Sequence, residues 1–266
     1  MTTGKQQKHH SVLALVAWGL IGLLFLLFAA HVIEVYVLHH DIRWYAIRDG
    51  VFYPEGDVRG IDISHYQETI DWDALAESTL HGVPVSFVFI KATEGKTIID
   101  ECFTRNFSEA RRHGILRGAY HVYSTLSSPQ EQARFFCNVV GLKDNDIVPI
   151  LDVEGLGTDS PEHIQTGILD WMNLVEKHYG VTPILYTSYN FRTTYLTDPQ
   201  FDRYPYWIAH YYIKNLAYTG RWAFWQHTDV GKVGGVKGYV DVNVFNGGYS
   251  DLLRLTVKEN RKENKE

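Results

Sequence analysis

Residues 85–91, VSFVFIK, and residues 147–153, IVPILDV, decide the fold class of this chain. Both runs are almost continuously apolar, a pattern typical of strands that are buried on both faces, as in parallel sheets. Further short apolar runs occupy residues 60–64, 117–123, 183–188, 206–210, 222–226 and 240–245. The sequence therefore predicts a sheet of eight strands between residues 60 and 245.

Helix-forming segments separate the first five predicted strands. Residues 129–140 and 161–179 each follow a serine cap, have proline at the first helical position and end before a glycine. Residues 71–79 and 101–113 are the other two predicted helices. Alternation of strand and helix implies right-handed βαβ units.

The spacing changes after the sixth strand. Only 11 residues separate His210 from Trp222, whereas a crossover with its helix needs at least about 10–12 residues. We therefore expect short loops or hairpins between strands six, seven and eight. The prediction is an α/β fold: a modified (β/α) barrel with eight strands and fewer than eight helices, preceded by one transmembrane helix.

The predicted transmembrane helix comes from residues 12–30, VLALVAWGLIGLLFLLFAA, which contain no charge. A helix of about 20 apolar residues crosses ~30 Å of hydrocarbon. Lys5 and Lys8 precede the run and no Lys or Arg follows it until Arg43, so the positive-inside rule places the N-terminus in the cytoplasm. The run is longer than the usual apolar region of a cleaved signal peptide, so we favour an uncleaved signal anchor over that alternative.

These features divide the chain into five expected parts. They are a cytoplasmic tail (1–10), a transmembrane signal anchor (11–38), a stalk (39–56), a barrel (57–254) and a charged tail (255–266). The expected localisation is a single-pass protein of the cytoplasmic membrane, with the barrel outside, on the periplasmic or cell-wall side.

Composition excludes several classes of function. With 31 acidic and 25 basic residues, the chain lacks the basic surface of a nucleic-acid binder. Cys102 and Cys137 have no CxxC spacing, which argues against a zinc or redox site, and two separate thiols are favoured over a disulfide. The chain has 13 histidines; none of them shows HxH or HExxH spacing, so we expect histidines to line a cleft rather than to bind a metal.

Polar residues occur at the end of every predicted strand. Burying polar groups costs free energy unless they are paired, and the active site of such barrels lies at the C-terminal strand ends. We therefore expect a convergent site there, built from Asp62, Lys91, Glu94, Tyr120, His121, Tyr123, Asp152, Glu154, Tyr186, Ser188, Trp207, His210, Trp225, Gln226 and Asp241.

Asp152 and Glu154 have the spacing that glycosidic chemistry needs. Residues two apart in a strand point to the same side, ~6.6 Å apart along the chain. Two neighbouring carboxyls do not ionise independently, so the pKa of one of them rises and that group can act as an acid. Hydrolysis of a sugar bond needs such an acid together with a second carboxylate.

At this point a family resemblance is clear. From Gly60 to Gly247 the chain resembles glycoside hydrolase family 25, the lysozymes of bacterial and phage origin. The shared motifs are GIDISHYQ, the DW at residue 71, FIKATEG, RGAYHVY, PILDVEG, PILYTS, YWIAHY, FWQHTD and VDVNVFNG. The N-terminal anchor is an addition to the pattern.

The resemblance implies a function and a site. It implies hydrolysis of the β-1,4 bond between N-acetylmuramic acid and N-acetylglucosamine, with Glu154 as general acid/base, Asp152 as its partner, and Asp62 and Asp241 as further acidic residues of the cleft. Direct attack by Asp152 and attack by the substrate's own 2-acetamido group both stay open. The implied substrate-binding residues are Glu94, Tyr120, His121, Tyr186, Trp207, Trp225 and Gln226.

The resemblance implies no cofactor, and the histidine spacing already argues against a metal. The expected partners are the glycan strands of peptidoglycan and the cytoplasmic membrane, which the N-terminal helix would enter.

Two other functions compete. A chitinase-like barrel also uses a D-x-E pair, but with aspartates two and five residues before the first acid, where this chain has Ile150 and Ile147. A non-catalytic sugar-binding barrel needs neither Asp152 nor Glu154, and the presence of both argues against it.

Overall fold

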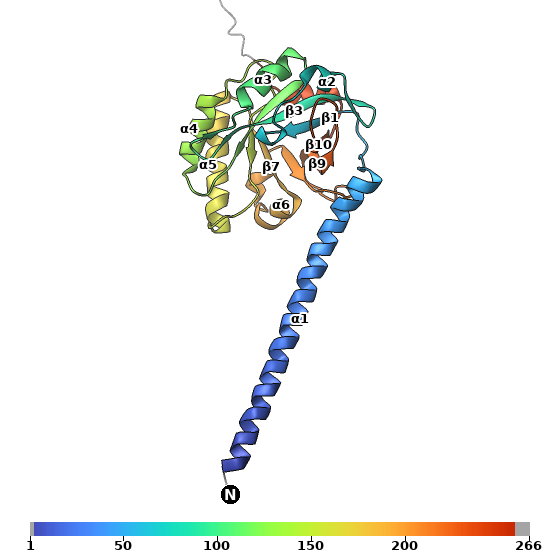
Figure 1. Cartoon of the computed structure of the whole chain (residues 1–266). Coiled ribbons are helices and arrows are strands. Elements are labelled where there is room, and N and C mark those ends of the chain that lie inside the picture. Colours follow the sequence, from blue (N-terminus) through green and yellow to red (C-terminus); the bar gives the residue numbers. More distant parts are fainter. Residues whose placement is uncertain (1–2, 259–266) are drawn as a thin grey trace, which may run out of the picture. The chain divides into compact units, whose positions relative to one another are not determined.

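The computed structural model describes residues 3–258 and divides into two compact units at Gly50. The first unit is one helix, α1 (Thr3–Asp49), shown in blue in Figure 1. Its segment Val16–Ile33 is long and apolar enough to cross a membrane. The helix continues to Asp49, so the first part of the expected stalk is helical. Residues 259–266 of the expected charged tail lie outside the described residues.

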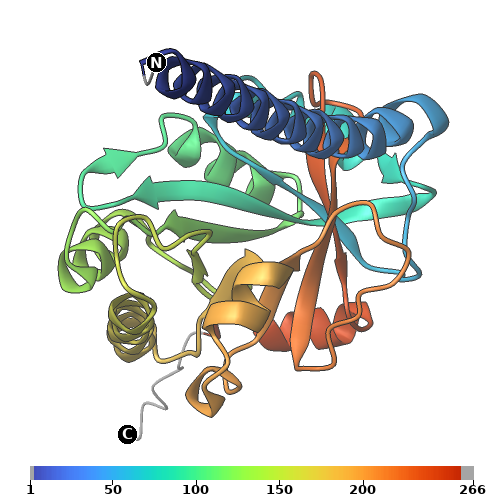
Figure 2. The same ribbon diagram turned by 90° about the horizontal axis from the view of Figure 1, so that it is seen from below.

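The second unit is a closed barrel of eight strands (Figures 1 and 2). In chain order the strands are β1 (Arg59–Ile63), β3 (Val83–Glu94), β5 (Leu116–Val122), β6 (Ile150–Asp152), β7 (Ile184–Ser188), β8 (Tyr206–Ala209), β9 (Trp222–Gly231) and β10 (Val240–Phe245). The ring closes because β1 pairs with both β3 and β10. All eight predicted strands are present, and the predicted fold class is confirmed.

The last part of the barrel departs from a regular βα repeat. Strand β9 follows β8 in parallel, and residues 210–221 between them form no helix. Strand β10 then returns antiparallel to β9, and it is also antiparallel to β1. The expected short connections are therefore present, and one strand of the barrel runs in the opposite direction to the other seven.

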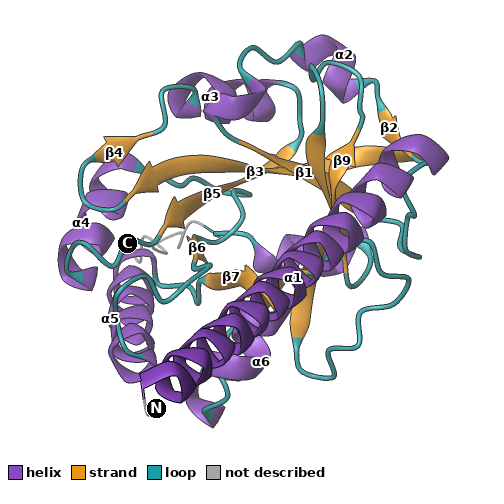
Figure 3. Cartoon of the chain, turned by 60° about the horizontal axis from the view of Figure 1, so that its bottom comes forward, coloured by secondary structure: helices purple, strands orange, loops and turns teal. Residues whose placement is uncertain are grey.

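Helices cover the outside of the strand ring (Figure 3). In the described part of this unit they are α2 (Trp72–Ala76), α3 (Phe103–Arg112), α4 (Pro129–Val139), α5 (Pro161–Tyr179), α6 (Tyr189–Tyr195) and α7 (Tyr249–Leu252), with 3-10 turns η1 (His65–Gln67), η2 (Pro199–Phe201) and η3 (Leu253–Leu255). The cap signals placed α4 and α5 well, because Ser128 and Ser160 each accept a backbone N–H in the first turn. The short strands β2 (Thr79–Leu80) and β4 (Ile98–Ile99), and helices α6 and α7, were not predicted.

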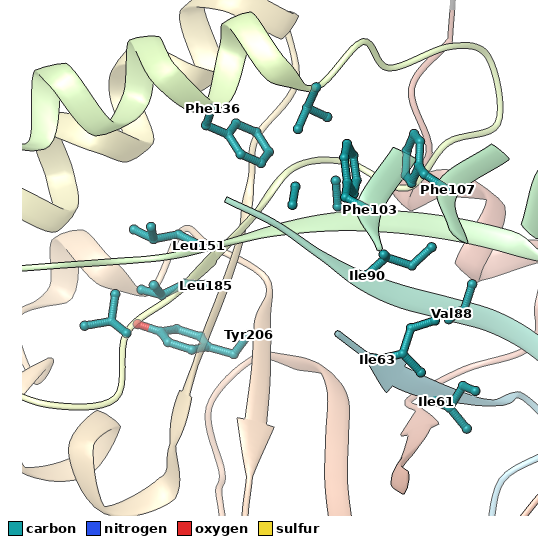
Figure 4. Packing of buried hydrophobic residues seen from close by; sticks show 14 of the residues in the cluster. Ile61, Ile63, Val88, Ile90, Phe103, Phe107, Phe136, Leu151, Leu185 and Tyr206 are labelled. Atoms are coloured by element: carbon teal, nitrogen blue, oxygen red, sulfur yellow. The ribbon is translucent and has the colours of Figure 1, made fainter. Parts of the chain in front are cut away.

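Two apolar layers hold the barrel together. Along β3, Phe87 and Phe89 point into the barrel, whereas Val88 and Ile90 pack outward, as the twofold repeat of a strand requires. Figure 4 shows the outer layer between the strands and helices. Inside, Gly60 and Gly118 leave room for the two phenylalanine rings, since a Cβ at either glycine would lie under 3.0 Å from a ring atom. The barrel is therefore a packed core that can support a site only at its ends.

Candidate active site

A cavity of about 280 Å³ opens at the C-terminal end of the parallel strands. It is lined by residues from most of the barrel strands and from the loops that follow β1, β6 and β8: Asp62, Ile63, Ser64, Tyr66, Gln67, Lys91, Tyr120, Val122, Asp152, Glu154, Tyr186, Trp207, Tyr211, Gln226 and Asp241. Four of these are carboxylic acids and one is a lysine. We call this space the cleft.

Asp62 and Asp241 reach the cleft from neighbouring strands. They are direct partners in the antiparallel pair of β1 and β10. Asp241 is the second residue of its strand, yet it lies at the cleft because β10 runs against the other strands. Two acids at paired positions repel each other when both are charged.

Asp152 and Glu154 reach the cleft from β6 and the residues after it. Asp152 ends the strand and is buried, and its Oδ1 atom has no hydrogen-bond partner within the described chain. Glu154 is exposed at the mouth of the cleft. A buried carboxylate oxygen without a partner is unusual in a folded protein and is typical of a functional site.

Burial raises the pKa of both acids, and neighbouring carboxylates raise that of Asp152 further. For Asp152, burial is the larger cause and the nearby Glu154 and Asp62 add to it, so its pKa lies well above the ordinary value. Partial desolvation also raises the pKa of Glu154, and the Lys91 ammonium opposes that rise. The cleft therefore retains protons on carboxyl groups at a pH where free carboxyls have lost them.

A chain of hydrogen bonds fixes Asp62. The hydroxyls of Tyr186 and Tyr211 both donate to Gln226 Oε1, at 2.7 and 2.8 Å. The Gln226 amide must then present Nε2 to Asp62, and it donates to Asp62 Oδ2 at 2.9 Å. Asn243 Nδ2 donates to the same oxygen at 2.7 Å, and Asn243 in turn accepts from Trp207 Nε1 at 2.7 Å.

The hydrogen-bond network and burial have opposite effects on the pKa of Asp62. Its two amide donors favour the anion, but burial is the larger cause and raises the pKa of Asp62 to about 6. Asp241 has fewer compensating donors, and burial together with the charge of Asp62 raises its pKa to about 9. At neutral pH, Asp62 is therefore the more acidic of the pair.

Most of the predicted site residues lie in the cleft. Asp152, Glu154, Asp62 and Asp241 line it, as do four of the residues assigned to substrate binding: Tyr120, Tyr186, Trp207 and Gln226. Their roles in chemistry stay predictions. What the structure adds is that all eight face one space.

Three of the predicted binding residues need correction. His121 is buried outside the barrel, where Nδ1 lies 2.7 Å from Thr93 Oγ1 and the ring stacks on Trp171. Trp225 does not line the cleft, and its indole N–H donates to the His210 carbonyl at 2.8 Å. The positions of His121 and Trp225 follow from the alternation of side chains along a strand, because their neighbours Tyr120 and Gln226 already face inward.

The third correction is Glu94. It does not line the cleft, and its Oε2 lies 2.6 Å from Lys91 Nζ. Glu94 therefore lies beside the cleft, where it pairs with Lys91 and its charge adds to the rise in the pKa of Asp152.

Sequence reasoning missed several cleft residues. Tyr211 follows β8 in a loop, next to the His210 that we had singled out, and the YWIAHY motif includes it. Tyr66 and Gln67 lie in the turn η1 directly after β1, where proximity to Asp62 was the available signal. Asn243 is fully buried and touches Asp62 without lining the cavity.

The histidines do not line the cleft as expected. His65 pairs with Asp100 at 2.9 Å, His227 is buried, and His210 lines a neighbouring cavity. Among the described residues, no group of three or more His, Cys, Asp or Glu side chains has the geometry of a metal site. Cys102 and Cys137 are both free thiols, as expected.

A larger cavity, of about 420 Å³, lies among Arg111, Arg117 and Asp146. Here the charges satisfy one another: Arg117 donates to both Asp146 oxygens at 2.7 and 2.9 Å, and Arg111 donates to Oδ1 at 2.9 Å. This arrangement is that of a structural ion pair, whereas the acids of the cleft have one cation among four carboxyls.

Comparisons with known proteins agree with this geometry. The model of glycosyl hydrolases family 25 matches residues 61–236. Lysozyme M1 of Streptomyces globisporus is 34% identical over 220 residues, 74% of this chain and 71% of that one. The uncharacterized protein YegX of Escherichia coli K12 is 40% identical over 215 residues, which are 80% of this chain and 78% of that protein.

Solved structures give the same result. A bacterial lysozyme from Streptomyces coelicolor superposes with a TM-score of 0.68 and 32% identity, covering 76% of this chain and 97% of that one. A family 25 glycosyl hydrolase from Bacillus anthracis superposes with a TM-score of 0.67 and 30% identity, covering 76% of this chain and 94% of that one. The chain belongs to glycosyl hydrolases family 25, and it is a glycosidase of the lysozyme type.

Asp241→Asn tests the charge balance of the cleft. A carboxyl group whose pKa is higher in the folded than in the unfolded state destabilises the fold at any pH above the unfolded-state pKa. The loss of stability grows with pH until the pH passes the folded-state pKa, which is about 9 here. The variant should therefore raise the free energy of unfolding at pH 7 by about 0.5–2 kcal/mol, and leave it unchanged near pH 3. Denaturant unfolding at both pH values measures this.

The same change should move the pH–activity profile. The charge of Asp241 opposes the ionisation of Glu154 only where Asp241 is itself ionised, near and above pH 9, so its loss should shift the alkaline limb to lower pH and leave the rate near pH 7 unchanged. Asp62→Asn should shift it in the same direction and lower the rate. Unchanged pH–rate curves in both variants would exclude the two aspartates from the site.

Proposed function

We propose that this chain is a membrane-anchored muramidase that hydrolyses the β-1,4 bond between N-acetylmuramic acid and N-acetylglucosamine in peptidoglycan. The observation that supports it most is the asymmetry of one acid pair: Asp152 is buried with a free carboxylate oxygen, and Glu154 is exposed beside it. The lysozymes among its relatives support the choice of substrate.

Glu154 is the general acid and base in this proposal. Its raised pKa keeps a proton available at the mouth of the cleft, where the glycosidic oxygen is in reach. Glu154 donates that proton as the bond from the anomeric carbon to the leaving oxygen breaks. In the second step the same carboxylate removes a proton from the attacking water.

Asp152 supports the other side of the reaction. Its free Oδ1 can accept a hydrogen bond from the N–H of a 2-acetamido group. The acetamido carbonyl oxygen then attacks the anomeric carbon as the glycosidic bond breaks, which gives a cyclic oxazolinium cation that water opens. This role favours the substrate-assisted route over direct attack by Asp152.

The raised pKa of Asp152 fits this role once substrate is bound. In the empty cleft, burial favours the protonated carboxyl. An amide donor and a developing positive charge both favour the anion. Asp62, which Gln226 and Asn243 hold in place, adds negative potential on the same side.

Cell-wall digestion tests the proposed activity. The purified full-length chain in detergent should lower the turbidity of a peptidoglycan suspension and leave chitin oligomers intact. Cleavage of chitin alone would indicate the chitinase-like function. Binding to peptidoglycan without any loss of turbidity would indicate the non-catalytic barrel.

Membrane topology is the other part of the proposal. Lys5 and Lys8 before the apolar run favour a cytoplasmic N-terminus and an external barrel. A phosphatase that folds only after export should be active when fused after residue 266. A stable but inactive fusion would contradict this orientation, and a mature protein some thirty residues shorter would indicate a cleaved signal peptide instead.

A further inference from the structure

A second cavity, of about 270 Å³, adjoins the cleft. It is lined by Glu154, Tyr186, Ser188, Tyr189, Asn190, Ala209, His210 and Tyr211. Three of these residues, Glu154, Tyr186 and Tyr211, also line the cleft. The two cavities therefore meet at a wall that includes Glu154, and we call the second one the side pocket.

The carboxyl groups are divided unevenly between the two spaces. Asp62, Asp152 and Asp241 line the cleft alone, whereas Glu154 lines both. Carboxylates stabilise the sugar ring that develops positive charge, so that sugar is expected to bind in the cleft. The leaving oxygen must lie against the acid, so the sugar bonded through that oxygen extends to the far side of Glu154, into the side pocket.

The side pocket is built around a stacked pair of rings. Tyr189 and His210 lie with ring centroids 4.6 Å apart and ring planes 22° apart. Tyr189 is the first residue of α6, which Ser188 caps by accepting the N–H of Phe191. His210 follows β8, so the two rings come from adjacent barrel segments.

The backbone of His210 is held from both sides. Its N–H donates to the Gln226 carbonyl at 3.0 Å, and its carbonyl accepts the indole N–H of Trp225 at 2.8 Å. Gln226 also holds Asp62. The position of the His210 ring is thus linked to the same strand, β9, that sets the geometry of the cleft.

The ring of His210 has unused hydrogen-bonding capacity. Its Nδ1 atom is buried and has no partner in the described part of the chain. Burial lowers the pKa of His210, so the neutral ring has one donor and one acceptor nitrogen. Beside it, Asn190 exposes an amide on the first turn of α6.

We propose that the side pocket binds the leaving sugar, an N-acetylhexosamine, with Tyr189 and His210 as its ring platform and Asn190 as a polar contact. This inference rests on the proposed function, because it takes Glu154 as the acid. The pocket matches a sugar of this class, which has apolar C–H faces together with hydroxyl and acetamido groups. Neither Tyr189 nor Asn190 was among the residues expected from the sequence.

Two substrates separate this binding role from a role in folding or chemistry. One is a peptidoglycan fragment, in which the leaving group is a sugar. The other has the same glycan before the scissile bond but fluoride as the leaving group, which is too small to reach the rings of the side pocket. A residue that binds the leaving sugar affects the first substrate and spares the second.

His210→Ala is the main variant, made in the full-length chain. It should lower kcat/KM for the peptidoglycan fragment about tenfold, as expected for loss of a ring contact and a hydrogen bond, and change kcat/KM for the glycosyl fluoride less than twofold. Asn190→Ala, at an exposed helical position, should act in the same direction without a risk to folding. His178→Ala is the matched control, because His178 also packs on a tyrosine ring, Tyr179, but lies on the outer helix α5.

Each result has a distinct meaning. An equal loss on both substrates in His210→Ala, with no selective loss in Asn190→Ala, would overturn the proposal and make the pair structural. No loss on either substrate would overturn it as well. A wild-type chain that cleaves neither substrate would refute the proposed function itself, and the inference with it.

Discussion

Glu154→Gln should lower the turnover of peptidoglycan by roughly 10²–10⁴-fold or more, the usual contribution of a positioned proton donor. The amide has the shape of the carboxyl but cannot donate a carboxyl proton to the leaving oxygen. Because Glu154 is exposed at the mouth of the cleft and no hydrogen bond of its side chain is seen in the described structure, the fold should be unaffected. Initial rates on peptidoglycan, with thermal unfolding as the control, measure both effects.

An activated substrate makes this test specific. An aryl leaving group needs little protonation, so the first chemical step of Glu154→Gln should be partly restored with an aryl glycoside. Gln67→Ala, another polar cleft residue, is the matched comparison and should show no such rescue. Near-normal lysis of peptidoglycan by Glu154→Gln would show that the acid has been assigned to the wrong residue.

Asp152→Asn should also be severely impaired, with turnover lower by roughly 10²–10³-fold or more, the range for loss of one preorganised electrostatic contact. The neutral amide cannot balance the positive charge that develops next to it. An aryl leaving group does not replace that charge, so this variant should gain nothing from the activated substrate. Comparison of the two variants on the two substrates therefore distinguishes an acid from a charge stabiliser.

The stability of Asp152→Asn checks the same assignment independently. The pKa of Asp152 is raised by burial and by Glu154 and Asp62, so its ionisation opposes folding at neutral pH. The variant should melt at or above the wild-type temperature at pH 7, with the difference vanishing at low pH where both states are protonated. A large drop in melting temperature would mean that Asp152 has a structural role instead.

The sequence was sufficient for the architecture of the barrel. The runs around Phe87 and Ile150 are apolar on both faces, and only a strand with helices outside and side chains inside fits them. Ser128 and Ser160 marked two helix starts because their hydroxyls replace missing backbone partners. Short elements such as α6 were missed, since seven residues give little periodicity.

The candidate site was harder to predict, because inward and outward positions alternate. Tyr120 and His121 are both polar, as are Trp225 and Gln226, yet only one member of each pair faces the cleft. Composition does not reveal which one. The phase of each strand depends on packing against its neighbours, and only the structure provides that.

Asp241 was predicted to lie in the cleft, and the structure shows that the direction of its strand puts it there. A residue near the start of a parallel strand lies at the opposite end of the barrel from the active site. Asp241 is in the cleft because β10 is antiparallel and pairs it with Asp62. Strand direction in the last hairpin is therefore what completes the group of four acids.

The identity of the new chain end tests the central claim most directly. Peptidoglycan digested by the full-length chain, then reduced with borohydride and analysed by mass spectrometry, should have N-acetylmuramitol at every new end, and Glu154→Gln should give almost none. New ends of N-acetylglucosaminitol, or 1,6-anhydro ends that resist reduction, would contradict hydrolysis at the muramic acid bond.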